Sequence, residues 1–71
     1  LYDHLSAWEN AEYFLGLAGV RATHAELDAA FADVGLPAEA RRRRVGGFSK
    51  GMRQKTALAV ALLRRAEALL L

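Results

Sequence analysis

The stretch FSKGMRQK, residues 48–55, lies between a glycine-containing loop and an apolar run over residues 56–63 that contains neither proline nor glycine. A serine hydroxyl at the start of a helix accepts a hydrogen bond from one of the N–H groups that the first turn leaves unpaired. We therefore predict that Ser49 caps a helix that begins at the next residue. The Arg64-Arg65 pair suits the negative end of a helix dipole and is predicted to close this helix.

Gly51 falls in the first turn of this predicted helix, where glycine costs roughly 1 kcal/mol relative to alanine. A glycine at such a position allows another molecule to approach the backbone closely. The unpaired N–H groups and the helix dipole both favour an anion at this end of a helix. Lys50, Arg53 and Lys55 add positive charge. The sequence therefore predicts an anion site at the helix N-terminus, most naturally for phosphate.

Towards the N-terminus, Ser6 and Glu9 have the spacing of a capping box, in which each side chain bonds to the backbone of the other residue. This pattern predicts a helix from about residue 7 to residue 17 or 18, with Gly19 ending it. The apolar face of this helix is expected to consist of Trp8, Ala11, Leu15 and Ala18, widened by Ala7 and Phe14.

Thr23 and Glu26 repeat the capping-box spacing. Apolar residues then recur with the period of an amphipathic helix as far as Gly35, which is the predicted end of a second helix. Pro37 suits the first position of a short helix that runs to about Arg41. The apolar positions of the second helix are Leu27, Ala30, Phe31 and Val34.

Composition favours a small all-α fold of three main helices plus one short helix. The 71 residues are 54% hydrophobic and include no cysteine, which excludes disulfides and cysteine-based zinc sites. The third helix is apolar nearly all round, so we predict that neighbours bury it, with Met52, Thr56, Ala59 and Leu63 on one face. Residues 68–71 are a potential strand.

Charge is divided unevenly between the two halves of the chain. Nine of the ten basic residues lie within residues 41–71, and seven of the eight acidic residues lie within residues 1–40. This asymmetry indicates an anionic partner for the C-terminal half. The Arg41-Arg42-Arg43-Arg44 block is interpreted mainly as a solvated turn. One alternative function is a small basic helical nucleic-acid-binding module, and another is a purely structural bundle, which leaves Gly51 unexplained.

The segment 48–55 also resembles the signature motif of the ATP-binding cassette (ABC) ATPases, whose usual form is Leu-Ser-Gly-Gly-Gln followed by basic and Gln residues. Ser49 and Gly51 match that form, Phe48 keeps the apolar first position, and Lys50 and Met52 depart from it. The Phe-Ser-Lys-Gly-Met variant is familiar among ATPases that power bacterial export-type transporters. The resemblance covers residues 1–71, and implies the helical subdomain of an α/β P-loop ATPase without its Walker A or Walker B motif.

The resemblance implies a parent subunit that hydrolyses ATP with Mg²⁺, dimerises, and lies at the cytoplasmic face of the membrane against a permease. The γ-phosphate of ATP held by the second subunit would meet the signature residues Phe48, Ser49, Lys50, Gly51 and Met52. The expected permease-facing residues are Tyr2, Asp3 and His4. No catalytic residue, metal, cofactor or nucleic-acid partner is expected for residues 1–71 alone. That fragment is expected to be inactive and to self-associate through Val60, Leu62, Leu63 and residues 69–71.

Overall fold

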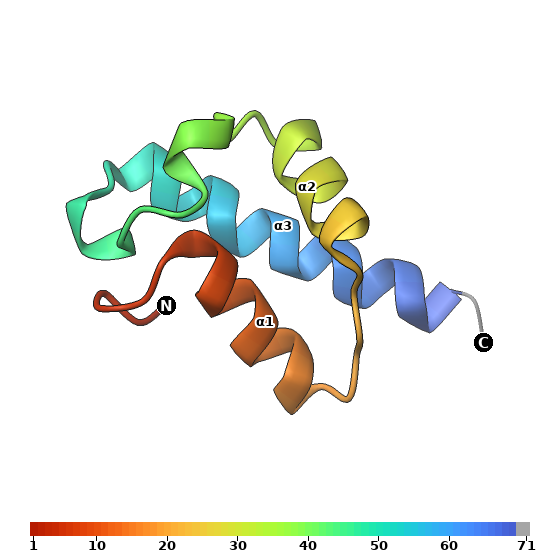
Figure 1. Ribbon diagram of the computed structural model, residues 1–71. Coiled ribbons are helices and arrows are strands. Elements are labelled where there is room, and N and C mark those ends of the chain that lie inside the picture. Colours follow the sequence, from red (N-terminus) through yellow and green to blue (C-terminus); the bar gives the residue numbers. More distant parts are fainter. Residues whose placement is uncertain (70–71) are drawn as a thin grey trace.

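Three α-helices make up most of the fold in the computed structural model, which describes residues 1–69 (Figure 1). They are α1 (Ala7–Leu17), α2 (His24–Asp33) and α3 (Lys50–Leu69). The connection between α2 and α3 contains two short 3-10 helices, η1 (Ala38–Ala40) and η2 (Val45–Gly47). α3 is the longest element, and α1 and α2 each pack against it. The all-α prediction is therefore confirmed.

Helix α1 begins and ends as its sequence predicts. The Glu9 N–H donates to Ser6 Oγ at 3.0 Å, and the Ser6 N–H donates to Glu9 Oε1 at 2.9 Å, which completes the capping box. The two hydrogen bonds to Ser6 hold the pKa of the Glu9 carboxyl below its ordinary value. At the other end Gly19 adopts a left-handed φ of 73°, which lets the Val20 N–H reach back to the Leu15 carbonyl at 2.8 Å.

Helix α2 has the same boundary devices. Thr23 and Glu26 form a second capping box, and its hydrogen bonds lower the pKa of the Glu26 carboxyl. Gly35 has a φ of 81°, and the next residue's N–H bonds to the Phe31 carbonyl at 2.9 Å. This turn directs Leu36, which is only 1% exposed, into the core. Local sequence chemistry thus sets both ends of both short helices.

One apolar core joins the three helices and the two 3-10 turns. Trp8 and Phe31 lie with ring centroids 6.2 Å apart near its centre, and complete burial of a side chain such as Phe31 contributes about 1.5–3 kcal/mol. Ala18, expected on the apolar face of α1, is exposed because it is already the C-cap. The buried apolar residues are Ala7, Trp8, Ala11, Leu15, Leu27, Ala30, Phe31, Leu36, Ala40, Val45, Phe48, Ala59 and Val60.

The connection between α2 and α3 is more structured than the sequence predicts. One short helix was expected from Pro37, which instead precedes η1 as its N-cap. The segment expected to be a loop before Phe48 contains η2, where the Phe48 N–H donates to the Val45 carbonyl at 2.9 Å. The turn places the Val45 side chain in the core, where it is 0% exposed, and this burial stabilises the turn.

Helix α3 does not end at Arg64-Arg65, so that prediction is wrong: the helix continues to Leu69. The potential strand, expected only where another strand pairs with it, is not formed at Ala68 and Leu69, and residues 70 and 71 lie outside the described residues. A strand needs a neighbouring strand for its backbone groups, whereas alanine and leucine are strong helix formers. In the described part of the chain, the sole β-type pairing is an isolated antiparallel bridge between Ser6 and Arg44.

The packing partly corrects the prediction of which α3 residues form an exposed apolar surface. Val60 is only 7% exposed and belongs to the core, and Leu63 is half-buried against it. Leu58 and Leu62 are 50% and 42% exposed, and within residues 50–66 these two are the large apolar side chains of α3 that face outward. Thr56 and Ala59 are fully buried, as their place on the inner face of the helix predicts.

Candidate functional site

The N-terminus of α3 has the cap that the sequence predicts. The Met52 N–H donates to Ser49 Oγ at 3.2 Å, and the Arg53 N–H donates to the Ser49 carbonyl at 3.0 Å. Among the residues that the structure describes, the backbone N–H groups of Lys50 and Gly51 have no acceptor. A hydroxyl that accepts one hydrogen bond still has its own proton to donate. This helix end therefore presents two free N–H groups and one hydroxyl donor.

Gly51 is not required by the packing or the backbone conformation of the described chain. A Cβ placed on Gly51 would meet nothing closer than Ser49 Oγ at 4.0 Å. Its φ is not positive, in contrast to those of Gly19 and Gly35. Gly46 differs again, because its Cβ would lie 3.0 Å from the Asp3 carbonyl oxygen. The space above Gly51 is open, and its helix-propensity cost has no explanation within the described residues.

The five predicted signature residues fall into two groups. Ser49, Lys50 and Gly51 are exposed at the helix end, whereas Phe48 is 9% exposed and belongs to the core. Met52 is half-buried and packs against the same core. Phe48 and Met52 therefore anchor the segment from both sides, and the three residues between them face solvent.

The three predicted cations do not contribute equally. Arg53 pairs with the carboxylate of Asp3 at 2.9 Å, which offsets much of its charge. Lys55 points towards the end of α2, where its Nζ lies 3.5 Å from the Gly35 carbonyl oxygen. Lys50 is exposed and makes no ion pair within the described residues. The positive charge available to an anion at this helix end comes chiefly from Lys50 and the helix dipole.

Part of the arginine block serves the fold. Arg41 is half-buried, and it donates to the Leu36 carbonyl at 3.1 Å and pairs with Asp28 at 3.3 Å. The Arg42 guanidinium lies over the Trp8 ring, 4.8 Å from the ring centroid. Arg42, Arg43 and Arg44 are exposed, as a solvated turn predicts. Because Arg41 and Arg42 are already engaged, the block offers a weaker surface for nucleic acid than four free side chains would.

The predicted permease-facing residues Tyr2, Asp3 and His4 are exposed and lie in the segment before α1. The Tyr2 ring packs against those of Tyr13 and Phe14, with centroids 5.2 and 5.8 Å away, and against His4 at 5.9 Å. The segment is therefore held to the surface of α1 by aromatic contacts.

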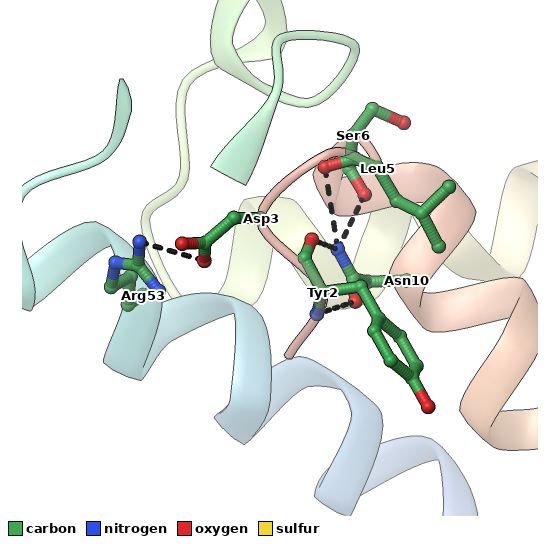
Figure 2. Close-up of polar contacts among 6 residues, drawn as sticks. All are labelled: Tyr2, Asp3, Leu5, Ser6, Asn10 and Arg53. Atoms are coloured by element: carbon green, nitrogen blue, oxygen red, sulfur yellow. Dashed lines mark hydrogen bonds and ion pairs between the residues drawn. The ribbon is translucent and has the colours of Figure 1, made fainter. Parts of the chain in front are cut away.

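Asn10 has a structural role that the sequence does not predict. Its amide is fully buried and bonds to Tyr2, Leu5 and Ser6, as Figure 2 shows. No spacing in the sequence indicates these bonds, because the partners are backbone groups of an irregular segment. The signal in the sequence is weak: Asn10 lies four residues before Phe14, at the edge of the apolar face that the sequence predicts for this helix.

The described residues do not form a metal centre. Among the side chains that the structure describes, those of residues 1–66, no three of the His, Cys, Asp or Glu type gather around one point. The chemistry at the α3 N-terminus consists of hydrogen-bond donors and positive charge, which fits a phosphate group but includes no carboxylate for Mg²⁺. In the same part of the chain, no helix is long and apolar enough to cross a membrane.

Comparisons with known proteins identify the family of the chain. A protein-family model described as ABC transporter matches residues 1–71, so the chain belongs to the ABC transporter family. Within that family it is of the ATP-binding class, the nucleotide-binding domains. The resemblance of residues 48–55 to the family's signature motif is consistent with this assignment.

One curated relative is the ABC transporter ATP-binding protein NatA of Bacillus subtilis (strain 168). It is 47% identical to the chain over 66 residues, which covers 89% of this chain and 26% of NatA. The chain thus spans about a quarter of the length of this relative. No solved structure matches the chain significantly.

Proposed function

We propose that residues 1–71 form the helical subdomain of the ATP-binding subunit of an ABC transporter. In this proposal the N-terminus of α3 binds the γ-phosphate of an ATP molecule held by the P-loop of a second subunit. The observation that carries the proposal is the open space above Gly51, beside two N–H groups without an acceptor. A partner must approach this backbone closely for a glycine to be useful there.

The donors at this helix end suit the terminal phosphate of a nucleotide. Two backbone N–H groups and the Ser49 hydroxyl can each donate to a phosphate oxygen, and hydrogen bonds to charged groups contribute about 1.5–3 kcal/mol. The helix dipole adds roughly 0.3–1 kcal/mol for an anion at its N-terminus. Lys50, exposed at the same place, adds a point charge. These groups bind and orient phosphate, and they neither accept a proton nor attack phosphorus.

The remaining parts of the reaction belong to other residues of the complete subunit in this proposal. ATP and Mg²⁺ are held by the partner's P-loop and acidic residues, because phosphoryl transfer depends on positioning and on metal-assisted charge stabilisation. The 71-residue chain alone is therefore expected neither to hydrolyse ATP nor to bind it more tightly than about 1 mM, which corresponds to roughly 4 kcal/mol.

The proposed assembly is a dimer of ATP-binding subunits at the cytoplasmic face of a membrane permease, with Tyr2, Asp3 and His4 towards the permease. The Phe-Ser-Lys-Gly-Met form of the signature supports a bacterial export-type transporter. In isolation the chain is expected to self-associate through the exposed Leu58 and Leu62.

The experiment that tests this function is ATP-dependent dimerisation of the complete subunit with Gly51→Asp. The added carboxylate occupies the place of the phosphate, and like charges at close range oppose docking. Helix stability should be retained, because an acidic residue in the first turn suits the dipole. Dimerisation and hydrolysis are expected to be lost, while ATP binding to one subunit remains.

The matched control is Ala25→Asp. Ala25 is exposed and is the second residue of α2, as Gly51 is of α3, so the substitution adds the same charge to an equivalent helix position. This variant is expected to dimerise as the wild type does. Normal dimerisation of the Gly51→Asp subunit, or equal loss in both variants, would contradict the proposal.

A further inference from the structure

The segment Tyr2–Ser6, termed the strap here, is tied to α1 by one buried side chain. Asn10 Nδ2 donates to the carbonyl oxygens of Tyr2 and Ser6, each at 3.0 Å, and its Oδ1 accepts from the Tyr2 N–H at 2.8 Å. These contacts use both donors and the acceptor of the amide. Figure 2 shows the amide inside the bend of the strap, which fixes the backbone on both sides of Asp3.

The other side of the strap contacts the segment that leads into α3. The Val45 N–H donates to the Leu5 carbonyl at 2.9 Å, and the Gly46 N–H donates to the Asp3 carbonyl at the same distance. The Asp3 carboxylate also pairs with Arg53 in α3 at 2.9 Å (Figure 2). Asp3 thus contacts η2 through its backbone and α3 through its side chain.

The strap contacts lie close to the proposed phosphate-binding groups, both in space and along the chain. A Cβ on Gly46 would lie 3.0 Å from the Asp3 carbonyl oxygen and 3.3 Å from Asp3 Cβ, so the strap and η2 are in close contact. Only residues 47 and 48 separate Gly46 from Ser49, and Phe48 is held in the core. A short series of close contacts therefore connects Asp3 to Ser49 and Gly51.

We propose that Asp3 is a positioning residue for the N-terminus of α3, acting through Gly46 and Arg53 on a strap that Asn10 holds. This inference rests on the proposed phosphate-binding role of Ser49 and Gly51. An exposed ion pair contributes little to stability, and the Asp3 and Arg53 side chains are 67% and 36% exposed. The effect of the Asp3–Arg53 pair is therefore geometric. The pair fixes where the N-terminus of α3 lies relative to the phosphate of the partner's ATP.

The test uses the complete subunit and measures kcat and KM for ATP together with thermal stability. Asp3→Asn removes the charge and keeps the backbone contacts. It is expected to lower kcat about fivefold, because an exposed pair is worth less than the free energy of a tenfold change in rate. KM for ATP and the melting temperature should stay at wild-type values, since the partner's P-loop binds the nucleotide first. Asp3→Glu should restore most of kcat.

A second variant reaches the same contact from the other side. Gly46→Ala forces the strap and η2 apart at the 3.0 Å contact without touching Arg53, and is expected to lower kcat at least as far as Asp3→Asn does. Asp28→Asn is the control, because it removes the charge from the Arg41–Asp28 pair at 3.3 Å, which includes no residue of α3 or of the strap. Its kcat should equal that of the wild type.

The inference is overturned if Asp3→Asn and Gly46→Ala both keep wild-type kcat. It is equally overturned if kcat falls only in proportion to lost thermal stability, or if Asp28→Asn lowers it as much. These results are distinguishable from failure of the proposed function. If Gly51→Asp abolishes dimerisation while the Asp3 and Gly46 variants are normal, only the positioning role fails. If Gly51→Asp is itself without effect, the phosphate-binding role fails.

Discussion

Ser49 Oγ lies 4.0 Å from the place that a Cβ on Gly51 would occupy, and apart from the adjacent residues and the helix backbone no atom is nearer. The same oxygen accepts the Met52 N–H and so caps α3. The cap and the open backbone next to it are therefore parts of one surface. A phosphate that approaches Gly51 meets the Ser49 hydroxyl at the same time.

Substitutions of Ser49 should separate its two roles. Ser49→Ala removes the cap and is expected to cost about 1 kcal/mol in the free energy of unfolding, whereas Ser49→Asp keeps a good cap. Both should impair ATP-dependent dimerisation of the complete subunit, Ser49→Asp more strongly because its charge repels phosphate. Chemical denaturation and analytical ultracentrifugation provide the two measurements. Full dimerisation of the stable Ser49→Asp subunit would rule out phosphate contact by this residue.

Gly16 and Gly19 form a matched pair for testing backbone conformation. Neither has an atom within 4 Å of an added Cβ, but only Gly19 has a left-handed φ, at 73°. Gly16→Ala should stabilise the chain by about 0.5–1 kcal/mol, because alanine is the better helix former. Gly19→Ala should destabilise it by roughly 1–2 kcal/mol. Thermal unfolding followed by circular dichroism would reveal an error if both substitutions shift the melting temperature in the same direction.

Both ends of α1 and of α2, and the beginning of α3, could be predicted from the sequence because their causes are local. Ser6 bonds to Glu9, three positions on, and so begins α1 where expected. Gly19 ends the helix by letting the N–H of the next residue bond to a carbonyl five positions back. Ser49 likewise caps α3 through a bond to a residue three positions on. The anion-site prediction rests on these same local features.

The remaining features depend on residues distant in the sequence. The sequence predicts that Arg53 adds positive charge to the anion site, but Asp3, fifty positions earlier, pairs with it. The bonds of Asn10 involve an irregular segment, so no periodic pattern signals them. The end of α3 was placed too early because a terminal basic pair favours a helix end without requiring it.

Acid should weaken the two capping boxes. The pKa values of Glu9 and Glu26 lie below their ordinary value of 4.5, because the charged form accepts the cap hydrogen bonds. A lowered pKa in the folded state contributes stability above pH 4.5, and this contribution is lost as pH falls through the folded pKa. The melting temperature should therefore decline below about pH 4.5 in the wild type.

The control for this pH dependence is the double variant Glu9→Gln with Glu26→Gln. Glutamine keeps an acceptor for the cap bond and does not titrate. Melting temperatures of the variant should decline less between pH 5 and pH 3 than those of the wild type. Parallel curves would show that other groups cause the acid sensitivity.

Loss of the Asn10 amide should loosen the strap. Asn10→Ala removes the acceptor of the Tyr2 N–H, and it removes one of the two donors to each of the carbonyls of Tyr2 and Ser6. A buried polar group without a partner costs about 1–3 kcal/mol, so we expect a loss of roughly 2 kcal/mol in the free energy of unfolding. Amide hydrogen exchange should accelerate at Tyr2 and at Gly46, whose N–H bonds to Asp3. Unchanged protection at Gly46 would show that the strap holds without Asn10.

Action of Gly51 on ATP held by the other subunit is tested most directly with dimers of defined composition, purified through two different affinity tags. One dimer pairs a Gly51→Asp subunit with a subunit whose P-loop lysine is substituted, which leaves one site with an intact P-loop facing an intact α3 N-terminus. The other dimer places both substitutions in one subunit beside a wild-type partner, which leaves no intact site. We predict that the first dimer hydrolyses ATP at about half the wild-type rate, from one site of two, and that the second does not hydrolyse it. Activity in the second dimer and none in the first would contradict the proposal, because Gly51 would then act on the ATP of its own subunit.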